Sequence, residues 1–88
     1  MMIVAYFYDG IPGGIPDPQL FTSLAKVRDA FREFIDSPCV TTEASAAIYY
    51  ADAQMVIDAI YCKVGCPFDY PDFVLGIGPR GGIKQERT

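Results

Sequence analysis

The sequence contains no histidine and no tryptophan, and only 20% of its 88 residues are charged. Without histidine, the chain lacks the side chain that most often acts as a general base at neutral pH. It also lacks the base of every Ser-His or Cys-His nucleophile pair and a common ligand of zinc. We therefore expect a protein without catalysis of these kinds.

Positive charge is also scarce, because seven basic residues are set against eleven acidic ones and the net charge is −4. Nucleic-acid binding depends mainly on neutralising phosphates, so this composition predicts no nucleic-acid partner. Long apolar runs are absent as well, since none approaches the roughly 18 residues of a membrane span. The opening stretch MMIVAYFYDG has neither the basic start nor the cleavage site of a signal peptide. We expect a cytoplasmic protein that has no membrane partner.

Apolar residues are abundant, at 51% of the sequence, and the length predicts one small domain over residues 1–88. Residues 2–8 form an uninterrupted apolar run rich in β-branched and aromatic side chains, which predicts a strand. Both faces of this strand are apolar, so it needs cover on both sides. A loop rich in glycine and proline follows at residues 9–16 and contains Gly-Ile-Pro twice.

A first helix is predicted from Asp17, as the N-cap, and Pro18 to the Ser37-Pro38 pair. One apolar stripe runs along it at spacings of three and four residues. The stripe consists of Leu20, Leu24, Val27, Phe31 and Phe34.

Residues 42–64 favour a second helix, with Thr42 as its cap and Gly65 just after its end. A second interpretation remains open. It makes residues 46–50, AAIYY, a strand and starts a shorter helix at Asp52. We prefer the long helix because no turn residue separates Tyr50 from Asp52.

Two further strands are expected at residues 73–77 and 82–87. The turn between them belongs to a G-x-G-x-x-G pattern made by Gly76, Gly78 and Gly81. In a dinucleotide site that pattern must be followed by a helix, and the six residues IKQERT are too few for one. We therefore expect no cofactor.

A β-hairpin explains the same residues. Pro79 suits the second position of a type I turn, and Gly81 suits the left-handed position that follows. This turn pairs Ile77 with Ile83, Leu75 with Gln85 and Phe73 with Arg87. It also leaves a bare surface at Gly76, Gly78 and Gly82, which an aromatic ring or a partner should cover.

These elements predict an α+β fold of order β-α-α-β-β. Its sheet would be three-stranded and largely antiparallel, with both helices layered on one face. The strand at residues 2–8 would then lie at an edge. An uncharged edge strand exposes unpaired backbone groups. We therefore expect a homodimer through this strand, by a continuous sheet or by contact between sheet faces.

Tyrosine is enriched in binding surfaces because it joins a large apolar body to a polar end. With loop 9–16 beside them, tyrosines and the glycine surface give the predicted binding residues: Tyr6, Tyr8, Tyr49, Tyr50, Gly76, Gly78 and Arg80. The expected function is that of a small, non-catalytic binding domain. It would recognise a protein partner or a small apolar ligand.

Two other groups of residues are weaker candidates for a functional site. Asp9, Asp69 and Asp72 could gather at one end of the sheet and form a small enzyme site or a metal-dependent site. Cys39, Cys62 and Cys66, with Asp69, could bind zinc, but the C-x-x-x-C spacing matches zinc patterns poorly and inert thiols are favoured.

Overall fold

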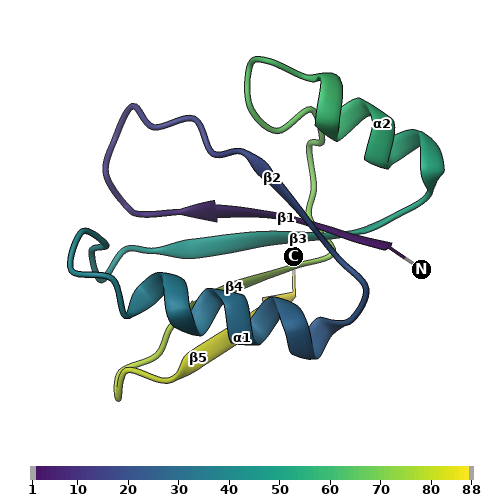
Figure 1. The fold of residues 1–88 in the computed structure, drawn as a ribbon. Coiled ribbons are helices and arrows are strands. Elements are labelled where there is room, and N and C mark those ends of the chain that lie inside the picture. Colours follow the sequence, from purple (N-terminus) through teal and green to yellow (C-terminus); the bar gives the residue numbers. More distant parts are fainter. Residues whose placement is uncertain (1, 88) are drawn as a thin grey trace.

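The computed structural model describes residues 2–87, which form a five-stranded antiparallel sheet with one helix on each face (Figure 1). The strand order is β2-β1-β3-β4-β5. Along the chain the elements are β1 (Met2–Tyr8), β2 (Pro18–Phe21), α1 (Leu24–Ile35), β3 (Ser45–Ala51), α2 (Ala53–Tyr61), β4 (Phe73–Ile77) and β5 (Ile83–Arg87). The α+β class agrees with the sequence-based expectation, but the three-stranded sheet is wrong because two further segments are extended.

The expected edge position of β1 is also wrong. β1 pairs with β2 along one side and with β3 along the other, so both of its edges are occupied within the chain. Five consecutive residues, Ile3 to Phe7, are buried, which agrees with the apolar character of both faces. The need for a neighbouring strand was inferred correctly, but the neighbour belongs to the same chain.

β2 replaces the predicted start of the first helix. Pro18 pairs with Tyr6 at the beginning of this four-residue edge strand, where a proline is tolerated. The helix begins only after Ser23, whose Oγ accepts a hydrogen bond from the Lys26 backbone amide at 3.3 Å. Leu20 therefore does not belong to the helical stripe, and it is 40% exposed.

The long second helix is wrong, and the alternative interpretation is confirmed. Every residue of β3, from Ser45 to Ala51, pairs with β1, and its first four residues also pair with β4. Asp52 then caps α2, because its Oδ1 accepts a hydrogen bond from the Met55 amide at 2.9 Å. An apolar run fits a central strand as well as a buried helix, so the pairing of β1 decided between them.

The C-terminal hairpin is confirmed in its register, since Ile77 pairs with Ile83, Leu75 with Gln85 and Phe73 with Arg87. The Gly81 amide donates to the Gly78 carbonyl at 3.0 Å, and Gly81 has a φ of 78°. The glycine pattern is therefore part of a tight turn between β4 and β5.

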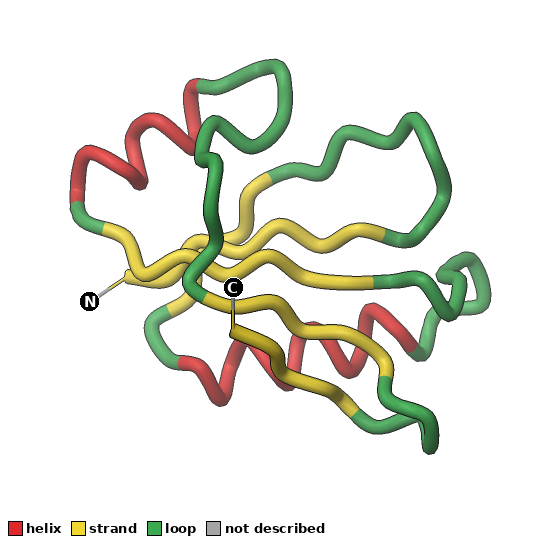
Figure 2. The backbone as a smooth tube through the Cα atoms, turned by 180° about the vertical axis from the view of Figure 1, so that it is seen from behind, coloured by secondary structure: helices red, strands yellow, loops and turns green. Residues whose placement is uncertain are grey.

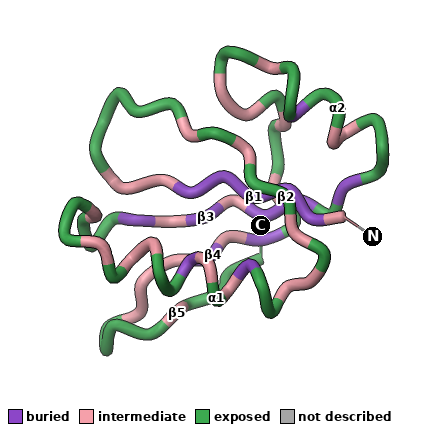
Figure 3. Tube along the Cα trace, in the orientation of Figure 1, coloured by how far each residue is buried: buried purple, intermediate pink, exposed green. Residues whose placement is uncertain are grey.

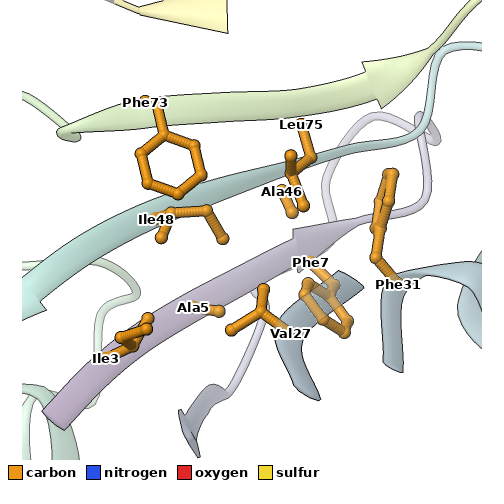
Figure 4. Close-up of a cluster of buried hydrophobic side chains, with 9 residues drawn as sticks. All are labelled: Ile3, Ala5, Phe7, Val27, Phe31, Ala46, Ile48, Phe73 and Leu75. Carbon is orange, nitrogen blue, oxygen red and sulfur yellow. The ribbon is translucent and has the colours of Figure 1, made fainter. Parts of the chain in front are cut away.

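The two helices lie on opposite faces of the sheet, so the predicted two-helix layer is wrong. α1 covers a cluster of nine buried residues that includes Phe31 and Leu75 (Figure 4). The second cluster contains Val4, Tyr6 and Tyr49 and packs against α2. Burial is concentrated along the central strands (Figure 3). Within residues 2–87, neither helix is long and apolar enough to cross a bilayer.

Candidate functional site

A concave, largely apolar surface lies where β1 ends and the chain turns back toward β2. Residues 9–17 form a wide loop there, which extends beyond the sheet (Figure 2). The loop, Tyr8, and the two aromatic rings of Phe7 and Phe34 line an open pocket of about 300 Å³. We call this the loop pocket.

Hydrogen bonds fix the first part of this loop. The Asp9 carboxylate accepts a hydrogen bond from the Ile11 amide at 2.8 Å, and the Asp9 carbonyl accepts from the amide and hydroxyl of Thr41. Gly10 has a φ of 85°, and a Cβ there would collide with Thr41 Oγ1 and the Glu43 side chain. The loop is therefore tied to the segment that precedes β3.

The floor of the loop pocket belongs to the core. The rings of Phe7 and Phe34 are 5.3 Å apart, and both contact Phe31. The walls come from the Gly-Ile-Pro repeat, whose Ile11 and Ile15 side chains are 53% and 66% exposed. Such exposure of two large apolar side chains beside a hollow is typical of a binding site.

Two of the predicted binding tyrosines lie in the core and not on the surface. Tyr6 is fully buried, and its hydroxyl has no hydrogen-bond partner within residues 2–87. Tyr49 is 4% exposed and packs edge-on against Tyr6, with ring centroids 6.0 Å apart. Segment 62–72 crosses the sheet from α2 to β4 (Figure 2). Its Cys66 and Phe68 pack against the cluster that contains both rings.

Burial controls the ionisation of these phenols. It raises the pKa of Tyr6 and of Tyr49, and the nearby thiol of Cys66 acts in the same direction on both. The pKa of Tyr8 is raised by the same two causes. All three hydroxyls are therefore protonated at neutral pH, and none of them can serve as a base there.

The other predicted binding residues are spread over separate surfaces. Tyr8 is half-buried in the loop pocket, whereas Tyr50 is 42% exposed on the α1 side and packs on Phe73. Gly78 and Arg80 border a second, more open hollow of about 360 Å³ at the turn between β4 and β5. The structure therefore brings only Tyr8 together with the Gly/Pro loop.

The aromatic cover expected over the bare glycines is absent from the described residues. A Cβ on Gly76 would meet the aliphatic stem of Lys84 at 3.8 Å, and one on Gly82 would meet nothing within 4 Å. Lys84 lies opposite Gly76 on β5 and so provides its nearest cover. A Cβ on Gly78 would meet the Gly82 carbonyl oxygen at 3.3 Å, so backbone covers this glycine and only Gly82 is open.

The three aspartates do not gather. β1 and β4 are both antiparallel to β3, so Asp9 after β1 and Asp72 before β4 lie at opposite ends of the sheet. The Asp72 carboxylate accepts a hydrogen bond from the Tyr50 amide at 2.7 Å, which is a structural role. Asp69 is exposed in segment 62–72. Within residues 2–87, no group of three or more acidic, cysteine or histidine residues could hold a metal.

The cysteines are free thiols, and Cys39 is exposed in the connection between α1 and β3. Cys66 Sγ lies 3.2 Å from the Tyr49 hydroxyl oxygen and 3.5 Å from the Phe68 carbonyl. Its single proton can be donated to either oxygen. The disfavoured alternative, a zinc site of these three cysteines with Asp69, has no counterpart among the described residues.

Sequence reasoning missed the floor of the loop pocket. Phe34 was assigned to the helical stripe, and only the tertiary fold brings its ring beside Phe7. The repeated Gly-Ile-Pro was the signal in the sequence for the walls of the loop pocket. Isoleucines exposed on a rigid loop do not improve solubility, so they indicate another role, such as contact with a ligand. The comparisons add no further candidate, since no family model, curated protein or solved structure matches this chain.

Proposed function

We propose that this protein is a small, non-catalytic binding domain that holds a small apolar ligand in the loop pocket. One observation carries the proposal. A pocket of about 300 Å³ is floored by two phenylalanine rings and walled by two half-exposed isoleucines. Ligand sites in proteins are mostly apolar hollows of about 300–1,000 Å³, so this pocket suits a ligand at the small end of that range.

The chemistry of the pocket supports binding without catalysis. Its one ionisable carboxylate, on Asp9, accepts a hydrogen bond from the Ile11 amide and so helps to shape the loop. The Tyr8 hydroxyl is its other ionisable group, and it is protonated at neutral pH. A ligand held there would be recognised by shape and apolar contact, with a single polar group near Tyr8 or Asp9.

Indole provides a direct test, because it is flat, apolar and carries one N–H donor. We expect indole to shift the backbone amide resonances of residues 7–15 and of Phe34 in an NMR titration. Ile11→Ser should weaken binding about fivefold, since the lost apolar contact is worth about 1 kcal/mol.

Ile57→Ser is the matched control, because Ile57 on α2 is 48% exposed and lies outside the pocket. It should leave the affinity for indole unchanged. Equal weakening by the two variants, shifts centred on α2, or no shift at millimolar indole would each contradict the proposal.

A further inference from the structure

A second surface, independent of the loop pocket, gathers positive charge on a protein that is acidic overall. It consists of Arg28 and Arg32 on α1 and Arg87 at the end of β5. These are three of the seven basic residues in the chain. We call this surface the arginine strip.

Two of these guanidinium groups are held against the C-terminal hairpin by neutral acceptors. Arg28 donates to the Gln85 side-chain oxygen at 2.8 Å, and Arg32 donates to the Gly81 carbonyl at 3.2 Å. The acidic residues of α1, Asp29 and Glu33, form no ion pair with either arginine within residues 2–87. The positive charge is therefore fixed in place and has no carboxylate partner there.

The two faces of β5 differ in charge. Ile83, Gln85 and Arg87 lie on the side covered by α1, because they pair with the buried side of β4. Lys84 and Glu86 lie on the other side and form an ion pair at 3.2 Å. On β5, the basic residue without a carboxylate partner among the described residues, Arg87, therefore lies on the α1 side.

β5 is also an edge strand of the sheet and pairs only with β4. The opposite edge, β2, is one residue shorter, begins with Pro18 and carries no charge. An exposed edge can accept an added strand through backbone hydrogen bonds. The arginine strip therefore borders the longer, proline-free edge of the sheet.

We propose that the β5 edge and the arginine strip bind an extended acidic segment of a partner protein, which adds to the sheet as a strand. Complementary charge selects this occupant. A second copy of β5 would bring its own arginines to the same side. A nucleic acid longer than the strip would meet a surface on which the four remaining basic residues oppose eleven carboxylates.

Strand geometry specifies the pattern of the bound segment. Side chains alternate between the two faces of a strand, so every second residue of the segment would point toward the arginines. β5 has five residues, which allows about three such positions. The recognised motif is therefore acidic at alternate positions.

The probe is a short, fluorescein-labelled peptide of alternating glutamate and threonine, titrated against the full chain by fluorescence anisotropy at low ionic strength. A parallel NMR titration should shift the amide resonances of residues 83–87. Arg28→Gln and Arg87→Gln should each weaken binding about threefold, and together about tenfold, as expected for exposed charge contacts.

Three controls separate strand addition from general attraction between charges. Lys63→Gln removes one exposed positive charge beyond α2 and should leave the affinity unchanged. A peptide of the same sequence with N-methylated backbone amides keeps its charge but cannot donate to the edge, and it should bind at least tenfold more weakly. A peptide with lysine in place of glutamate should not bind.

The proposal is overturned by any of four results. These are no binding of the acidic peptide, equal effects of Lys63→Gln and Arg28→Gln, equal affinity of the N-methylated peptide, or tighter binding of oligothymidylate. The arginine strip shares no residue with the loop pocket. A negative result for the acidic peptide therefore does not affect the proposal that the loop pocket binds an apolar ligand.

Discussion

At the scale of single residues, Tyr6 shows how sequence and structure assign different roles to one side chain. A tyrosine in an apolar strand is a reasonable candidate for a binding surface. In the fold, Tyr6 is fully buried under α2 and segment 62–72, and its hydroxyl has no partner within residues 2–87. A buried hydroxyl without a hydrogen bond costs about 1–3 kcal/mol.

We predict that Tyr6→Phe stabilises the protein at pH 7 by about 1 kcal/mol and raises the thermal midpoint by about 5 °C. Thermal unfolding followed by circular dichroism measures this. Tyr70→Phe is the control, because Tyr70 is 86% exposed and should behave like the wild type. A lower midpoint for Tyr6→Phe would mean that the hydroxyl makes a favourable contact.

We predict that Tyr6→Phe also changes how the free energy of unfolding depends on pH above pH 9. Burial raises the pKa of Tyr6 above 10.0, its value in the unfolded chain, so the unfolded chain loses this proton first as the pH rises. Ionisation of Tyr6 therefore leaves the free energy of unfolding unchanged below pH 10. Above pH 10 it lowers this free energy, by about 1 kcal/mol at pH 11. Urea titrations should show a smaller loss between pH 9 and pH 11 in Tyr6→Phe than in the wild type.

At the scale of elements, residues 42–64 show where local patterns fail. Their apolar stripes suit a helix, but residues 45–51 form the central strand β3, and only Ala53–Tyr61 are helical. The local signal for this break is Asp52. It is a weak signal in the sequence, because aspartate occurs on the surfaces of helices as well as at their starts.

We predict that Asp52→Ala destabilises the protein by about 1 kcal/mol, because the Met55 amide loses its acceptor at the start of α2. Urea denaturation measures this, with Asp69→Ala in the exposed loop as the control. The sign of the effect is decisive. In one continuous helix, alanine at position 52 would stabilise, because alanine has the higher helix propensity.

At the scale of the whole molecule, the order of the strands decides which surfaces are free. Both edges of β1 are paired within the chain, so a second copy cannot extend the sheet at β1, whereas a dimer through contact between sheet faces stays a prediction. The outer side of α2 is different, because Ile57, Ile60, Tyr61 and the following Val64 are between 48% and 85% exposed. An apolar helix surface of this kind is typical of an interface.

We predict that two copies associate through this α2 surface at micromolar concentration. In a two-fold packing, the exposed apolar side chains of α2 would pack against the same side chains of the partner. Sedimentation velocity should detect the dimer, and Ile60→Lys should return it to a monomer. Ile11→Lys in the loop pocket is the control and should leave the dimer intact. A monomeric wild type would contradict this prediction.

Sequence alone determined the features that depend on near neighbours in the chain. The strand at residues 2–8, the apolar stripe of α1 from Leu24 onward, and the register of the β4–β5 hairpin follow from alternation, helical spacing and turn chemistry. The Gly-Ile-Pro repeat also marked the loop beside which Tyr8 lies.

Only the tertiary structure decided the rest, because it depends on which strands become neighbours. Pro18–Phe21 is a strand because β1 needs a partner at that edge, and Ser45–Ala51 is one because β1 needs another on its opposite side. Those pairings bury Tyr6, separate Asp9 from Asp72, and place Phe34 beside Phe7. They also leave β5 at an edge next to the arginines of α1, and no local pattern in the sequence contains that arrangement.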